Sequence, residues 1–182
     1  EMLRIRRCTR AFSALVESSQ NSLMCHAMLE GQAQKQDSDL NFTNFGSLVE
    51  TLRNSIEQTE LGQVHSEKHI NDISKLLKRV KINPKEWTPY TAFVRGRYTR
   101  TLVGYDEKFV ALLLCWEKGQ RSPIHDHAGA SCWVKMLSGT LHEVRYEHRD
   151  GKLCEVEETN FFAEQGDVSY MNDTRGVHQI IN

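Results

Sequence analysis

The sequence contains an H-x-H pair, His125-Asp126-His127, whose side chains are suited to bind a metal ion. If the pair lies on a β-strand, residues i and i+2 face the same side, so both imidazoles point one way and Asp126 points the other. Two imidazoles supply half of a metal site, and a third ligand must come from another segment. His178, in a strand-like segment near the end of the chain, is the candidate. The pair taken alone is equally compatible with two polar residues on an exposed strand face.

The residues around this pair follow a recognisable spacing. From Gly119 to Gly139 the chain reads glycine, five residues, His-Asp-His, four residues, Cys132, six residues and glycine. This stretch resembles the first motif of the cupin superfamily, G-x5-H-x-H-x(3,4)-E-x6-G, with Cys132 where most cupins have glutamate.

A second stretch begins at Gly166 and ends with His178, three residues and Asn182. It resembles the tail of the second cupin motif, although Asn172 stands where a proline is usual and the spacing to the histidine is one residue longer. The two stretches together imply a cupin jelly-roll barrel with metal ligands in both.

The replacement of the glutamate changes the charge of the ligand set. With a thiol at that position and Asp126 facing away, the predicted ligands are three neutral imidazoles, those of His125, His127 and His178. A neutral set leaves a divalent metal with its full charge, so the metal can attract an anionic ligand such as a thiolate. Fe(II) with open positions suits O2 chemistry, but imidazole also suits zinc, copper and nickel.

Longer stretches of the chain resemble the cysteine dioxygenase family. They are Asn83-Pro84-Lys85-Glu86-Trp87, Arg97-Tyr98-Thr99-Arg100, Leu114-Cys115-Trp116, Ser122–His127 with Cys132 and Lys135-Met136-Leu137 after it, and Tyr170–Asp173 leading to His178. The resemblance covers about residues 45–182 and does not include the first 44.

This resemblance implies that His125, His127 and His178 bind ferrous iron, Fe(II). L-cysteine would bind the iron through its thiolate and amine, and O2 would take the remaining position. Both oxygen atoms would be added to sulfur, giving cysteine sulfinic acid. The family further implies a part in cysteine catabolism and taurine biosynthesis, and a monomeric protein without a nucleic-acid or membrane partner.

The resemblance also assigns substrate contacts. Arg100 would hold the substrate carboxylate, which a guanidinium group can bind through two parallel hydrogen bonds. Tyr98, two residues earlier on the same strand face, would lie beside it, and Leu114 and Trp116 would help to wall the pocket. Cys132 corresponds to the cysteine that, in animal-type members, forms a thioether crosslink with a tyrosine.

That tyrosine lies well past the third histidine in these relatives, whereas this sequence ends four residues after His178. We therefore expect an incomplete sequence of a longer dioxygenase, with its C-terminal strands missing; a natural short form is the alternative. The third ligand would then lie on an unpaired end, so we expect weak iron retention and little activity from these residues alone.

Other functions remain open. A relative that oxidises 3-mercaptopropionate usually has glutamine at the position of Arg100. A zinc hydrolase also uses three histidines with a bound water, but no nearby residue here is spaced as a general base. A cupin-like binding domain without activity would be consistent with the missing tyrosine.

The candidate residues need a β framework, and the hydrophobic pattern predicts one behind a small helical region over residues 45–89. Apolar residues at helical spacing predict helices over 45–56 and 70–80, and Asn83-Pro84 ends the second helix. From Tyr90 onward the pattern predicts short strands, with hairpin turns at Ser138-Gly139 and Asp150-Gly151. The expected fold class is mainly β, an incomplete jelly-roll barrel over residues 90–182.

The composition is that of one globular domain. The 182 residues are 39% hydrophobic and 26% charged, and the net charge of -1 gives no electrostatic case for nucleic-acid binding. No apolar run is long enough to span a bilayer. Five cysteines without regular spacing argue against a disulfide framework and favour a reducing, cytoplasmic location.

Residues 1–44 differ from the rest of the chain. The first 22 of them are rich in arginine and serine and have only two acidic residues, Glu1 and Glu17, and 31–44 read as a polar linker. We expect a disordered tail or an extension here, with a mitochondrial transit peptide as the weaker alternative.

Overall fold

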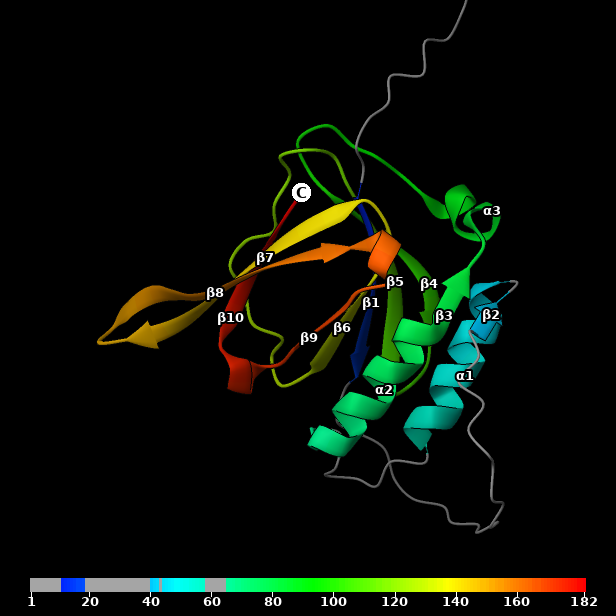
Figure 1. The fold of residues 1–182 in the computed structure, drawn as a ribbon, viewed down its shortest axis with the longest axis horizontal. Coiled ribbons are helices and arrows are strands. Elements are labelled where there is room, and N and C mark those ends of the chain that lie inside the picture. Colours follow the sequence, from blue (N-terminus) through cyan, green and yellow to red (C-terminus); the bar gives the residue numbers. More distant parts are fainter. Residues whose placement is uncertain (1–10, 19–39, 43, 58–64) are drawn as a thin grey trace, which may run out of the picture.

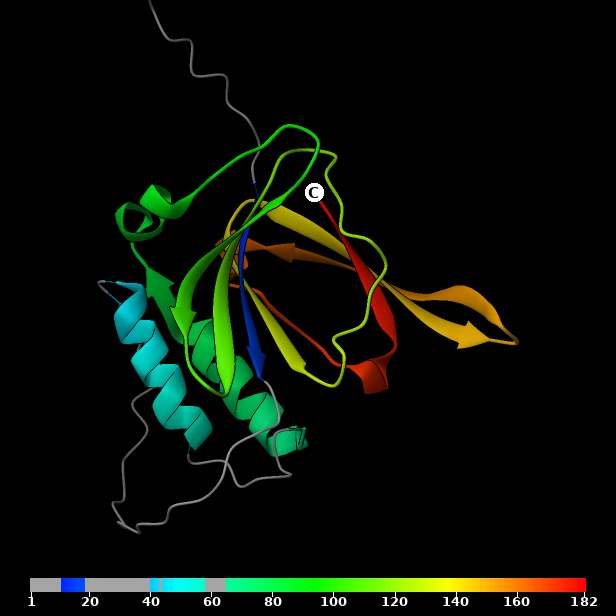
Figure 2. The ribbon, with the colours of Figure 1, turned by 180° about the vertical axis from the view of Figure 1, so that it is seen from behind.

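The computed structural model describes residues 11–18, 40–42, 44–57 and 65–182 of the chain. It is mainly β, with a small group of helices before most of the strands, as the sequence predicts. Figures 1 and 2 show three layers: the helices, a five-stranded sheet and a three-stranded sheet. A short parallel pair of strands, β2 (Leu40–Phe42) and β3 (Val80–Ile82), lies beside the helices.

The two long helices are amphipathic and cover the outer face of the five-stranded sheet. Helix α1 (Phe45–Glu57) buries Leu48, Leu52 and Ile56, and helix α2 (Glu67–Arg79) buries Ile70, Ile73 and Leu77. These side chains form one apolar cluster with inward residues of the sheet, among them Phe109, Leu113 and Trp133. The removal of this apolar surface from water stabilises the helix-on-sheet packing.

Short polar side chains fix the helix ends. The carboxamide of Asn44 accepts a hydrogen bond from the Ser47 amide at 2.9 Å at the start of α1. The Ser66 hydroxyl accepts one from the His69 amide at the start of α2. Asn83 caps the short helix α3 (Pro84–Trp87), and a 3-10 turn, η1 (Thr88–Tyr90), follows. The prediction that Asn83-Pro84 ends the second helix is wrong, because α2 ends at Arg79 and Val80 already pairs in β3.

The five-stranded sheet has the order β4-β5-β1-β6-β9. Its strands are β1 (Ala11–Ser18), β4 (Thr99–Tyr105), β5 (Phe109–Trp116), β6 (Ser131–Ser138) and β9 (Val168–Met171). The continuous apolar run of β5 is buried along most of its length, because helices cover one face of the sheet and the second sheet lies over the other.

Strand β1 lies within the segment for which the sequence analysis expected a tail. It pairs antiparallel with both β5 and β6 and so occupies the middle of the sheet. Residues 11–18 have five apolar residues without strict alternation and lie among arginines and serines, so the pattern did not predict a strand. Of the remaining residues 1–39, none is among those described, and the expected tail and targeting segment fall there.

The three-stranded sheet has the order β10-β7-β8. Its strands are β7 (Thr140–Arg149), β8 (Lys152–Phe162) and β10 (Val177–Ile181). The 3-10 turn η2 (Ala163–Gln165) follows β8, and another, η3 (Asp173–Arg175), precedes β10. Among the described strands, the two larger sheets do not pair with each other into a closed barrel.

The two predicted hairpin turns have different outcomes. Asp150-Gly151 joins the paired strands β7 and β8, with the positive φ angles of 51° and 72° that a tight primed turn requires. The hairpin prediction at Ser138-Gly139 is wrong, because β6 pairs with β1 and β9 whereas β7 pairs with β8 and β10. Gly139, the single residue between β6 and β7, instead carries the chain from one sheet to the facing one. Both connections contain a glycine with a positive φ angle after a small polar residue, so local sequence could not distinguish them.

Between the sheets lies a second apolar cluster, which includes Leu114, Trp116, Val134, Leu141 and Ile180. It draws residues from both sheets and therefore holds them together. Among the described residues, no helix combines the length and apolarity needed to cross a membrane.

Gly104 makes the closest approach between α1 and strand β4. A Cβ atom at this position would lie 2.1 Å from Cγ2 of Val49 and 3.3 Å from Cβ of Ala111. We expect Gly104→Ala to lower the free energy of unfolding by about 1–3 kcal/mol, the usual cost of overpacking a core contact. Urea unfolding measures this change.

The Val49→Ala background serves as the control, because it removes the methyl group that the new Cβ would strike. Gly104→Ala should cost clearly less there than in the wild type. An equal cost in both backgrounds would contradict the proposed contact.

Candidate metal centre

The three predicted metal-binding histidines come together from two segments far apart in the chain. His125 and His127 lie in the connection between β5 and β6, and His178 lies in β10. The expectation that the H-x-H pair forms a strand is wrong: only His125 makes a strand-like pairing, in which its amide and carbonyl exchange hydrogen bonds of 3.0 Å with those of His178. This backbone pair places the first and third histidines side by side.

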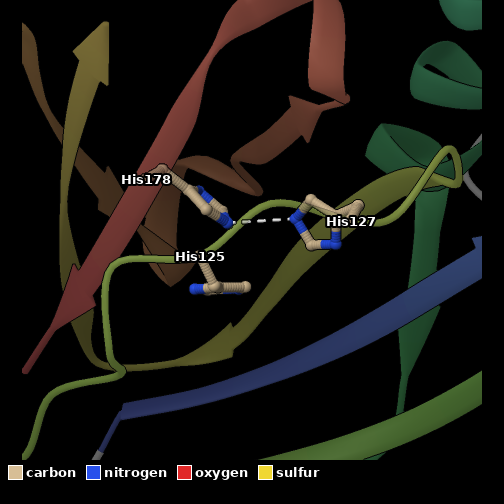
Figure 3. A group of neighbouring side chains, drawn as sticks. All are labelled: His125, His127 and His178. Carbon is tan, nitrogen blue, oxygen red and sulfur yellow. Dashed lines mark hydrogen bonds between the residues drawn. The ribbon is translucent and has the colours of Figure 1, made fainter. Parts of the chain in front are cut away.

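The ring nitrogens form a compact group that fits a metal ion. One nitrogen from each imidazole lies within 4.8 Å of the other two, and Nε2 of His127 is 3.0 Å from Nε2 of His178 (Figure 3). Two nitrogens bound at right angles to one ion, each at the ~2.1 Å typical of imidazole ligands, would be roughly 3 Å apart. The distances between the ring nitrogens therefore suit the three-imidazole site that the sequence predicts.

The hydrogen bonds of two imidazoles assign their ring protons. Nδ1 of His125 lies 2.9 Å from the carbonyl oxygen of Pro123, which can only accept, so Nδ1 carries the proton. Nδ1 of His178 lies 2.5 Å from Oε1 of Glu143, a carboxylate that likewise accepts. With Nδ1 as the donor, Nε2 of each ring can offer its lone pair to a metal, the arrangement that protein metal sites commonly use.

Glu143 is a component of the site that the sequence analysis missed. Its side chain is buried, and its second oxygen accepts a hydrogen bond of 3.0 Å from the Ser169 hydroxyl in β9. Glu143 thus fixes the ring of His178, the most deeply buried of the three histidines, at 2% exposed. The sequence did contain one sign of this role. Glu143 lies two positions after Leu141 and so on the same inward face of β7, where a charged residue is unusual.

Burial favours the neutral form of the two imidazoles of the H-x-H pair. Burial, with smaller contributions from His178 and His125, lowers the pKa of His127 from its ordinary 6.5 to about 4. The pKa of His125 is also lowered, mainly by burial. Neutral imidazole is the form that binds metal, so protons compete little with a metal at neutral pH.

A cavity of about 260 Å³ opens beside the histidines. All of the predicted substrate-binding residues line it: Tyr98, Arg100, Leu114 and Trp116. The ring of Tyr98 stacks on Trp116, with centroids 4.0 Å apart and planes 11° from parallel. Nη2 of Arg100 donates a hydrogen bond of 2.9 Å to the Tyr98 hydroxyl. The pairing of β4 with β5 and these side-chain contacts therefore fix the four residues relative to one another.

Asp126 and Cys132, which the sequence analysis also discusses, lie in different environments. Asp126 is exposed and contributes to the cavity wall but does not belong to the group of potential ligands. Cys132, in β6, is buried in the cluster between the sheets and lies opposite Met171 of β9. Its crosslinking role stays a prediction.

The lowered pKa of His127 makes the stability of the metal-free protein depend on pH. Between pH 6.5 and about 4, the unfolded chain binds a proton at this residue that the folded protein does not bind. Acidification across this range therefore favours unfolding, and stability is fully retained above pH 6.5. After allowance for partial exposure, we expect a loss of roughly 1–2 kcal/mol in urea unfolding with a chelator present.

The variant His127→Gln should show a correspondingly smaller loss across the same pH range. His148→Gln, at an exposed position of β7, is the matched control and should behave as the wild type. The same pH dependence in His127→Gln as in the wild type would refute the assignment.

Comparison with known proteins agrees with the geometry of the site. The chain is 34% identical over 118 residues to cysteine dioxygenase type 1 of Rattus norvegicus and, to the same extent, to that of Homo sapiens. Each match covers 64% of this chain and spans 59% of the length of the relative. Cysteine dioxygenase type 1 of Danio rerio is 33% identical over 138 residues, 73% of this chain and 68% of the relative.

The family described as "Cysteine dioxygenase type I" matches residues 43–182, which include the helices α1–α3, the whole cavity wall and the three histidines. The fold and the histidine group agree with this match. The chain therefore belongs to the cysteine dioxygenase type I family.

Proposed function

We propose that this chain is a non-haem iron dioxygenase that adds both atoms of O2 to the sulfur of L-cysteine, giving cysteine sulfinic acid. The observation that carries the proposal is the common cavity: the three-imidazole group and the guanidinium of Arg100 line the same space of about 260 Å³. Free cysteine has a thiol to meet a metal and a carboxylate to meet an arginine.

His125, His127 and His178 would hold the iron. When bound, Fe(II) supplies the redox chemistry between O2 and the thiol. The three ligands bring no charge, so a thiolate is favoured at the metal over a neutral ligand. The contact with Glu143 fixes the His178 ring, so that one ligand direction is set before the metal arrives.

Arg100 would bind the substrate carboxylate. The hydrogen bond to Tyr98 uses only one of its donors and holds the side chain against the wall of the cavity. Its other N–H groups remain suited to a bidentate contact with a carboxylate. The stacked Tyr98–Trp116 pair makes this position rigid, which lowers the entropic cost of binding.

Most of the remaining wall is apolar and limits the access of water, and Ser122 and Asp126 add polar groups to it. Leu114, Trp116, Val134 and Ile180 line the cavity and are themselves buried. These buried side chains lower the local dielectric constant on their side of the cavity, whereas Arg100 itself is exposed to solvent. A small thiol amino acid is the substrate class that suits such a space, with another small thiol such as 3-mercaptopropionate as the alternative.

Arg100→Gln should separate the roles of carboxylate and thiol. We expect the KM for cysteine to rise roughly 10- to 100-fold, the loss expected for a charged hydrogen-bonded pair, and the KM for cysteamine, which lacks a carboxylate, to change little. Steady-state O2 consumption by the iron-loaded protein measures both.

Arg95→Gln is the matched control, because Arg95 is exposed and is not among the residues that line the cavity. It should leave both KM values unchanged. Equal effects of Arg100→Gln on cysteine and cysteamine would contradict the carboxylate role, and a preference for 3-mercaptopropionate in the wild type would favour the alternative substrate.

Metal loading tests the reaction class itself. We expect the purified protein to bind one Fe(II) and, on addition of cysteine, to consume one O2 for each sulfinic acid formed. Elemental analysis, an oxygen electrode and mass spectrometry of the product give the three quantities. Stoichiometric zinc without O2 uptake would indicate a hydrolase instead, and bound iron without uptake would indicate a binding domain.

A further inference from the structure

The turn that follows His127 has an unfavourable backbone conformation. Ala128 and Gly129 both have positive φ angles, 49° and 86°, and the Ala130 amide closes the turn on the His127 carbonyl at 2.9 Å. Glycine adopts this region freely, but alanine does so at a cost of roughly 1–2 kcal/mol. Contacts from outside the turn must therefore hold it.

The carboxylate of Asp173 makes such contacts. Oδ1 accepts a hydrogen bond of 2.9 Å from the His127 amide, and Oδ2 accepts one of 2.6 Å from the Gly129 amide. The two oxygens thus bind the amides on either side of Ala128. Hydrogen bonds to an ionised acceptor are stronger than those between neutral groups, so this pair can offset the cost of the turn.

Asp173 is also joined to the other half of the metal centre. It opens η3, which leads through Gly176 directly into β10 and His178. A Cβ at Gly176 would lie 2.4 Å from the Tyr146 carbonyl oxygen of β7, so this connection is packed closely against the three-stranded sheet. The carboxylate of Asp173, at the start of this connection, therefore anchors the turn after His127 to the same three-stranded sheet that carries His178.

The two histidines of the H-x-H pair are thus attached differently. His125 is tied to His178 by two backbone hydrogen bonds, which no side-chain substitution removes. His127 is tied to the same region by the side chain of Asp173. This difference makes the position of the His127 ring sensitive to one residue that lies 46 positions away in sequence.

We propose that Asp173 is a positioning residue of the metal centre, whose carboxylate holds the turn after His127 so that this imidazole faces His178. The inference rests on the proposed function only in requiring that the histidine group binds a metal. The metal affinity, and not the turnover, is therefore the quantity to measure.

The test uses the full chain and the probes Fe(II) and Co(II), with each Kd determined by competition with a chelator. We expect Asp173→Asn, in which an NH2 group replaces one acceptor oxygen, to weaken both affinities about 10- to 100-fold, as is typical for the loss of a group that orients a ligand. At saturating Co(II), its ligand-field absorption should shift toward that of His127→Ala.

Asp167→Asn is the matched control. Asp167 also accepts a backbone hydrogen bond through its carboxylate, from the Phe162 amide at 2.8 Å, but it lies in the connection between β8 and β9. This variant should keep the wild-type metal affinity. If both variants lose the same unfolding free energy and neither loses affinity, Asp173 is merely structural and the proposal fails.

A double-mutant cycle with His127→Ala tests whether Asp173 acts through His127. In that background, Asp173→Asn should cause little further loss of Co(II) affinity. An undiminished further loss would overturn the proposal. A wild-type protein that binds metal but does not consume O2 would contradict the proposed function and leave this inference standing, whereas a protein with no metal affinity would overturn both.

Discussion

The backbone pairing of His125 with His178 is the contact on which the geometry of the metal centre depends. It joins a connecting segment to a strand through two hydrogen bonds of 3.0 Å and brings two imidazole rings to a centroid distance of 4.6 Å. Because β10 pairs with β7 over its whole length, these two rings are held by the three-stranded sheet and not by a free loop. The third ring, that of His127, has only to be brought to a pair that is already fixed.

The cavity wall opposite the histidines depends on the other sheet. Tyr98 precedes β4, Arg100 lies in it, and Trp116 ends β5, so their relative positions follow from the pairing of β4 with β5. The outer face of the same sheet is packed against α1 and α2, with Gly104 allowing β4 to approach α1 closely. The helices carry none of the candidate site residues, yet they support the strands that present the guanidinium to the metal centre. The site thus lies where two independently supported sheets meet.

The three histidines could be predicted from the sequence, because His125 and His127 lie in one short motif and His178 in a second, and each motif can be read locally. The same is true of the helices, whose apolar stripes repeat at helical spacing. The turn at Ser138-Gly139 could not be assigned, because the choice between a hairpin and a crossing to the facing sheet is made by the packing of both sheets. Glu143 and Asp173 were missed for a related reason: each acts through a contact with a residue tens of positions away, and a lone acidic residue in a strand or turn carries no sign of its partner.

These acidic residues also bear on the charge of the centre. An imidazole that binds a metal is a neutral ligand, so a divalent ion held by these three rings would keep its full charge in a partly apolar cavity. Glu143 touches one imidazole, and the negative charges of Asp173 and Asp126 are close enough to act on the His127 ring. An unpaired ion in a partly apolar cavity would have a large desolvation cost. Carboxylates outside the ligand set offset part of the charge of the ion and so reduce this cost. Because they occupy no ligand position, this compensation would leave the remaining positions of a bound ion open to further ligands.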